Sequence, residues 1–76
     1  RRMLPPFEGK RVLDLGCGFG WHCRYAAEQG AASVVGVDLS ERMLAEARAM
    51  TDSPSIQYLR MPIEAIEFPA GSFDVR

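Results

Sequence analysis

An apolar strand that ends in an acid and breaks into alternating glycines dominates the first third of this chain. Residues 12–20 read VLDLGCGFG, so Asp14 stands near the end of the apolar stretch and glycines follow at positions 16, 18 and 20. Glycine lets the backbone turn sharply where a side chain would block the approach of a ligand. Residues 21–29 then read as a helix whose first amide groups face the same point. A strand, a glycine turn and a helix in this order are typical of a nucleotide site.

The rest of the chain repeats the alternation of strand and helix. The expected strands cover residues 11–15, 33–38, 56–60 and, as the opening of a fourth, 73–75, and the expected helices cover 21–29 and 41–50. Ser40 is the expected N-cap of the second helix. Met43, Ala47 and Met50 form a stripe on that helix, which we expect to face the sheet. The sequence therefore predicts an α/β fold built from βαβ units.

The length and composition set the outer bounds. At 76 residues the chain amounts to at most one small domain, with residues 1–10 as a lead-in and 11–76 as strand–helix repeats. The chain stops just after the fourth strand opens, so we expect it to be part of a longer domain and to be inactive on its own. An apolar share of 47% argues against disorder. The net charge of −1, with no basic stripe, offers no electrostatic basis for binding nucleic acid or a membrane surface.

The cysteines and the single histidine bear on metal binding and on location. Cys17 lies in the glycine turn, Cys23 in the following helix, and His22 is the only histidine. Because there is no second pair of ligands, we expect no metal site. No stretch reads as a signal peptide or a membrane span. We therefore expect two reduced thiols in a cytoplasmic protein.

The spacing of the glycines distinguishes between possible ligands. Dinucleotide enzymes favour G-x-G-x-x-G, whereas here Trp21 stands where the third glycine of that pattern would fall. Asp38 ends the second strand 22 residues after Gly16, close to the spacing of an acid that binds ribose. Its other possible role is to serve the start of the following helix. An NAD(P)-binding oxidoreductase segment and a non-catalytic cofactor-binding module both stay open as alternatives.

The glycine run resembles D-x-G-x-G-x-G, the first motif of the class I S-adenosylmethionine-dependent methyltransferases. The resemblance continues through VVGVDLS at 34–40 and SFDV at 72–75, so it covers nearly the whole chain. It implies a Rossmann-like, doubly wound, mostly parallel sheet in the order 3-2-1-4 with helices on both faces. It also implies methyl transfer from S-adenosylmethionine to an unknown acceptor, small or macromolecular, with this chain supplying the cofactor-binding half.

The resemblance implies cofactor contacts in two groups. Those expected around the methionine part are Asp14, Gly16, Cys17 and Gly18, and Gly20 is expected to bind the cofactor as the last glycine of the motif. Those expected around the ribose and adenine are Asp38, Leu39, Met43 and Ile63. Asp14 would approach the amino group, Asp38 would hold the ribose and Leu39 would pack on one face of adenine. For Met43, packing in the core is an equally good interpretation.

The resemblance has one departure and leaves the catalytic residues open. Many members carry an Asp and an Ala after the third strand, where Pro62 and Ile63 stand here. Proline has neither an acceptor side chain nor an N–H, so we expect adenine contacts at the backbone of Ile63. His22 could contact the cofactor or the substrate, or be a surface residue, and Trp21 could be a pocket wall or pack against the sheet. In this family the residues that select the methyl acceptor usually follow the fourth strand. Separately, we expect the open edge of the sheet to favour self-association of the chain.

Overall fold

The computed structural model describes residues 7–62, 68 and 71–74 of the chain. Its elements are, in order, β1 (Arg11–Leu15), α1 (Trp21–Glu28), β2 (Ser33–Asp38), α2 (Glu41–Ala49) and β3 (Ile56–Arg60). These bounds confirm the three strands and two helices expected from the sequence. The fourth strand is not formed at Phe73 and Asp74, and Val75 lies outside the described residues.

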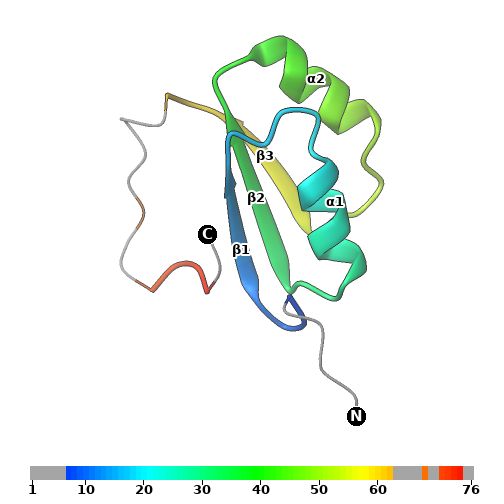
Figure 1. Cartoon of the computed structure of the whole chain (residues 1–76), viewed down its shortest axis with the longest axis vertical. Helices are drawn as coiled ribbons and strands as arrows, with labels where there is room; N and C mark the ends of the chain where they lie inside the picture. Colours follow the sequence, from blue (N-terminus) through cyan, green and yellow to red (C-terminus); the bar gives the residue numbers. More distant parts are fainter. Residues whose placement is uncertain (1–6, 63–67, 69–70, 75–76) are drawn as a thin grey trace.

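The three strands form one parallel sheet with β2 in the middle (Figure 1). Residues level with one another across the sheet are Val12, Val34 and Ile56 in one row and Asp14, Gly36 and Tyr58 in another. Counted from β3, the order is 3-2-1, as predicted. The N–H of Asp74 donates to the carbonyl of Arg11 at 2.7 Å. The chain therefore returns beside β1, where the predicted order places its fourth strand.

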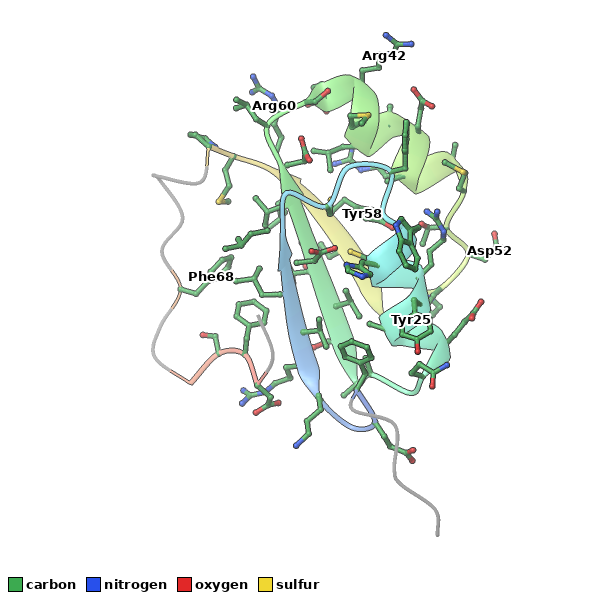
Figure 2. All side chains as sticks on the ribbon, viewed as in Figure 1. Tyr25, Arg42, Asp52, Tyr58, Arg60 and Phe68 are labelled. Atoms are coloured by element: carbon green, nitrogen blue, oxygen red, sulfur yellow. The ribbon has the colours of Figure 1, made fainter. Side chains whose placement is uncertain are left out.

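Both helices cover the same face of the sheet (Figure 1). α1 packs against all three strands, and α2 packs against β2 and β3. We expected helices on both faces, but consecutive right-handed crossovers that step in one direction across a sheet leave their helices on one side. A helix on the other face needs a crossover that steps outward from β1. Among the described residues, Phe68 lies on that other side (Figure 2), edge-on to Phe73 with ring centroids 4.9 Å apart.

The core lies between the sheet and the helices. Its buried members are Val12, Cys17, Cys23, Ala26, Val34, Leu44, Ala47 and Tyr58. The stripe of α2 that was expected to face the sheet does so with one exception. On α2, Ala47 is buried and Met43 is half-buried, whereas Met50 is 51% exposed. The expected inward position of Met50 is wrong because α2 ends at Ala49 and Met50 forms its C-cap. Leu44, which has no exposed surface, fills the core instead.

The helix starts follow from local chemistry. The hydroxyl of Ser40 accepts the N–H of Met43 at 3.2 Å, so Ser40 is the N-cap of α2 as predicted. Glu41 adds negative charge in the first turn, where the helix dipole favours it. α1 begins instead after Gly20, which has a φ of +81° and no side chain to cap the helix. The start of α1 therefore depends on the loop that precedes it.

Candidate functional site

The loop of residues 16–20 joins β1 to α1 at the carboxyl end of the sheet. Its three glycines all have positive φ, at +72° for Gly16, +56° for Gly18 and +81° for Gly20. The N–H groups of Gly16 and Cys17 donate to the carbonyl of Val37 at 2.7 and 3.0 Å, which anchors the loop on β2. A Cβ at Gly16 would meet no heavy atom within 4 Å. The loop therefore has open space beside it.

A tight turn occupies the second half of this loop. The N–H of Gly20 donates to the carbonyl of Cys17 at 2.9 Å. Gly18 has positive φ and Phe19 does not, which are the signs of a type II′ turn. Nη1 of Arg24 donates to the carbonyl of Phe19 at 2.7 Å, so a side chain from α1 also holds the turn.

Asp38 joins this loop to the segment that follows β2. Its Oδ2 accepts the N–H of Gly18 at 2.8 Å and its Oδ1 accepts the N–H of Ser40 at 2.9 Å. Hydrogen bonds from these N–H groups, Ser40 first, lower the pKa of the Asp38 carboxyl, so it is ionised at neutral pH. Each carboxylate oxygen has a second lone pair. Asp38 can therefore serve the helix start and still accept hydrogen bonds from a ligand.

Tyr58 forms the floor beneath the loop (Figure 2) and explains two glycines. A Cβ at Gly20 would overlap the Tyr58 hydroxyl and lie 2.9 Å from its Cε1, and a Cβ at Gly36 would lie 3.0 Å from its Cδ1. The Tyr58 hydroxyl is 2.7 Å from that of Thr51. The sequence analysis assigned no role near the site to Tyr58 or Gly36. The available signal was the glycine inside an otherwise β-branched strand, because such a glycine often marks a place where another part of the protein comes close to the backbone.

The two thiols lie in the core under the loop. A Cβ at Gly36 would be 2.8 Å from the sulfur of Cys23 and 3.0 Å from that of Cys17. Both cysteines are reduced, as expected. Burial raises the pKa of the Cys17 thiol to about 11 and also raises that of Cys23, so both thiols are neutral. Because the Cys17 side chain is buried, only its backbone can face a ligand.

The remaining expected contacts occupy different positions around the loop. The carboxylate of Asp14 is half-buried, and its Oδ2 accepts the Cys23 thiol at 3.6 Å. Met43 is half-buried, and its Cε would lie 3.9 Å from a Cβ at Gly18, so it borders both the core and the loop. Ile63 lies outside the described residues.

Leu39 follows Asp38 and is 59% exposed. Nε of Arg60, at the end of β3, donates to the carbonyl of Leu39 at 3.1 Å (Figure 2). This bond holds the backbone of the segment after β2 from the neighbouring strand. An apolar side chain therefore lies exposed next to an ionised acid, on a backbone that is held in place.

Trp21 and His22 open α1 and lie on its surface. Trp21 is 64% exposed, so of its two interpretations the structure does not support packing against the sheet, and the role of a pocket wall stays open. Its ring lies against that of His22, with centroids 4.6 Å apart, and against the edge of Tyr25 at 6.4 Å. These rings follow directly after the glycine loop.

A glycine loop after β1 and an acid at the end of β2 define a nucleotide-binding domain of the Rossmann-like type. Ligands of such sheets bind outside the carboxyl ends of the strands, and the loop, Asp38 and Leu39 all lie at that end. The open space at Gly16 suits a ligand that approaches the backbone closely. The ionised Asp38 suits hydroxyl groups, and the exposed Leu39 suits a flat apolar ring.

Comparison with known proteins identifies the family. The family model described as a methyltransferase domain matches residues 12–76, and the chain belongs to this family. An S-adenosylmethionine-dependent methyltransferase from Mesorhizobium loti aligns at 53% identity with a TM-score of 0.86, over 95% of this chain and 33% of that protein. A putative S-adenosylmethionine-dependent methyltransferase from Listeria monocytogenes aligns at 63% identity and a TM-score of 0.80, over 86% and 30%.

The curated relatives agree with the solved structures. A ubiquinone biosynthesis O-methyltransferase from Hahella chejuensis is 46% identical over 78 residues, which cover 99% of this chain and 31% of the relative. The chain thus spans about a third of the length of these proteins. The comparisons confirm the expected class I methyltransferase domain and S-adenosylmethionine as its cofactor.

Proposed function

We propose that this chain supplies the cofactor-binding half of an enzyme that transfers a methyl group from S-adenosylmethionine to an acceptor. One observation carries the proposal: the N–H of Gly18 in the glycine loop donates to Asp38 at the end of β2, at 2.8 Å. This bond brings the loop and the acid together at one edge of the sheet. A ligand that spans both is therefore held at two ends by groups already in place.

The geometry supports a specific role for each part of the site. The backbone of Gly16, Cys17 and Gly18 would lie against the methionine part of the cofactor, with Gly20 closing the turn. Asp14 would approach the amino group. Asp38 would accept hydrogen bonds from the ribose hydroxyls with the lone pairs that Gly18 and Ser40 leave unused. Leu39 and Met43 would border the adenine. The resemblance adds the backbone of Ile63, which lies outside the described residues.

Methyl transfer from S-adenosylmethionine often needs little acid–base catalysis. When bound, S-adenosylmethionine would supply the methyl group from its positively charged sulfur to the acceptor, and S-adenosylhomocysteine would be left as the second product. Alignment and exclusion of water can supply much of the rate. We therefore assign the described residues to binding and orientation, and place the groups that choose the acceptor in sequence that follows the fourth strand.

The thiols support a cytoplasmic setting for this function. Cys17 and Cys23 flank the same point near Gly36 and are unbridged. Disulfides form and persist in oxidising compartments and are rare in the cytosol. Among the described residues, no helix is long and apolar enough to cross a membrane.

Calorimetric titration of a polypeptide extended to the full length of the relatives, with S-adenosylmethionine, S-adenosylhomocysteine and NAD as ligands, tests the proposal. We expect heat of binding from the first two ligands and none from NAD. The control is adenosine alone, which should bind more weakly because it lacks the methionine part that the glycine loop contacts. Micromolar affinity for NAD without a response to S-adenosylhomocysteine would establish the oxidoreductase alternative instead.

A further inference from the structure

We propose that Arg24 is a positioning residue that sets the conformation of the cofactor loop, an inference that rests on the proposed function. Arg24 lies on α1, one helical turn after Gly20. Its backbone N–H donates to the carbonyl of Gly20 at 3.0 Å, and its guanidinium Nη1 donates to the carbonyl of Phe19 at 2.7 Å. One residue therefore holds two successive carbonyls at the end of the loop.

These bonds fix the peptide group between Phe19 and Gly20 from both sides. The Arg24 guanidinium holds the carbonyl of Phe19, and the N–H of Gly20 donates to the carbonyl of Cys17 at 2.9 Å. Because a peptide group is planar, fixing its oxygen and its N–H fixes its orientation. Gly18 and Gly20 flank this part of the turn and both allow either sign of φ. Without the guanidinium, the turn has other accessible conformations.

The Arg24 bond differs in kind from the anchors to Val37. Those two anchors join backbone groups only, through N–H groups that every residue type except proline supplies, whereas the anchor to Asp38 joins a backbone N–H to an ionised carboxylate. The bond from Arg24 comes from a charged side chain, and hydrogen bonds to charged donors are shorter and stronger than neutral ones. The residue type at position 24 therefore matters to the loop in a way that the types at 37 and 17 do not.

Arg48 offers a matched control. Its Nη2 also donates to a backbone carbonyl, that of Tyr58 at 3.2 Å, but this carbonyl belongs to β3 and not to the loop. Its Nη1 also pairs with Glu41 at 3.8 Å on the surface of α2. Replacing either arginine with methionine keeps most of the side-chain length and removes one arginine–carbonyl bond.

The experiment uses a polypeptide extended to the full length of the relatives and compares the parent sequence with Arg24→Met, Arg24→Lys and Arg48→Met. Three quantities are measured for each: the affinity for S-adenosylhomocysteine, the thermal midpoint without ligand, and the amide exchange rate of Gly20. We expect Arg24→Met to weaken binding about tenfold and to speed exchange at Gly20, while the amides of β2 keep their rates. Arg24→Lys should recover part of the affinity. Arg48→Met should lower the thermal midpoint and leave the affinity unchanged.

The outcomes separate this role from a merely structural one. Parent-like affinity in Arg24→Met overturns the proposal, whatever the exchange rate at Gly20. Equal losses of affinity in Arg24→Met and Arg48→Met overturn it as well, because they would indicate general destabilisation. A full-length parent without any affinity for S-adenosylhomocysteine would refute the proposed function and this role with it, a result visible before any variant is made.

Discussion

At the scale of single residues, the glycines around the site perform two different tasks. Gly16 faces open space and leaves room for a ligand. Gly20 and Gly36 face the protein itself, because Tyr58 lies where their side chains would be. The first kind was predictable from the motif, and the second was not, because it depends on a partner more than 20 residues away in sequence. The same holds for Arg24, whose bond to the loop requires the helix to be in place.

Gly36→Ala should destabilise the fold. The new methyl group would lie 2.8 Å from the sulfur of Cys23 and 3.0 Å from Cδ1 of Tyr58. Overpacking of this kind typically lowers the free energy of unfolding by about 1–3 kcal/mol. Urea unfolding of the chain measures the change. In the double variant Gly36→Ala/Cys23→Ala the clash with the Cys23 sulfur is gone, while the contacts with Cys17 and Tyr58 remain. The two effects should therefore fall short of additive by roughly 0.5 kcal/mol or more. Strict additivity would show that the Cys23 sulfur gives way freely.

Asp38→Ala should weaken binding of S-adenosylhomocysteine by about 1–3 kcal/mol, the range for hydrogen bonds to a charged acceptor. The change removes the ribose acceptor and also releases the N–H of Gly18. Gly18→Val should be worse, because a branched side chain opposes the φ of +56° and enters the ligand's space. Asp52→Ala, an exposed acid away from the loop, is the control. If Asp38→Ala binds as tightly as the parent, the ribose assignment is wrong.

At the scale of elements, glycines and prolines mark the chain so clearly that all three strands and both helices were predictable. The failures have physical causes. Met50 fits the helical period, but the helix ends one residue before it. The sequence predicted a strand at Phe73 and Asp74, but a strand there requires a ladder of hydrogen bonds to β1. The backbone hydrogen bond described for them is the one from the N–H of Asp74 to the carbonyl of Arg11. Periodicity describes an element and does not say where its partner begins.

The contact between Arg11 and Asp74 should resist acid. Nε and Nη2 of Arg11 donate to the two carboxylate oxygens at 3.1 Å each, and its N–H donates at 2.9 Å. These bonds lower the pKa of Asp74 from 3.8 to about 2. Since the pKa is lower in the folded chain than in the unfolded chain, the contribution to stability is complete above about pH 4 and disappears as the pH falls through 2.

An NMR titration of the Asp74 carboxyl carbon measures this pKa directly. In Arg11→Met the pKa should return toward its ordinary value of 3.8. The pair is exposed, so the same substitution should change the overall stability little. An ordinary pKa for Asp74 in the parent chain would contradict the docking of residues 71–74 beside β1.

At the scale of the whole molecule, the resemblance predicted the cofactor and the order of the strands. The expectation of helices on both faces does not hold for the two described helices, which cover the same face (Figure 1). The predicted order 3-2-1-4 already implies this, because the first two right-handed crossovers both step from β1 toward β3. The acceptor depends on parts of the enzyme that the cofactor motifs do not describe.

Extending the chain to the full length of its relatives should change its stability, self-association and activity. The 76 residues span about a third of those proteins, and among the described residues no strand pairs with the outer edge of β1, where the predicted order 3-2-1-4 places the fourth strand. Because an unpaired edge favours association, we expect the chain alone to melt broadly, self-associate or bind cofactor weakly, and not to transfer methyl groups. A polypeptide extended to the full length of the relatives should be more stable and active. Sedimentation, thermal melting and a methyl-transfer assay compare the two. A monomeric chain that melts cooperatively and turns over substrate would refute this expectation.

Trp21 gives the molecule an optical label of its own. It is the only tryptophan in the chain, and it is the first residue of α1, directly after the glycine loop. Its indole lies against the ring of His22 and is largely exposed to solvent. The emission wavelength and intensity of an indole change when its exposure to water or its contact with a neighbouring ring changes. The emission of the unmodified protein therefore reports changes at the start of α1, next to the glycine loop, in real time and without an added dye.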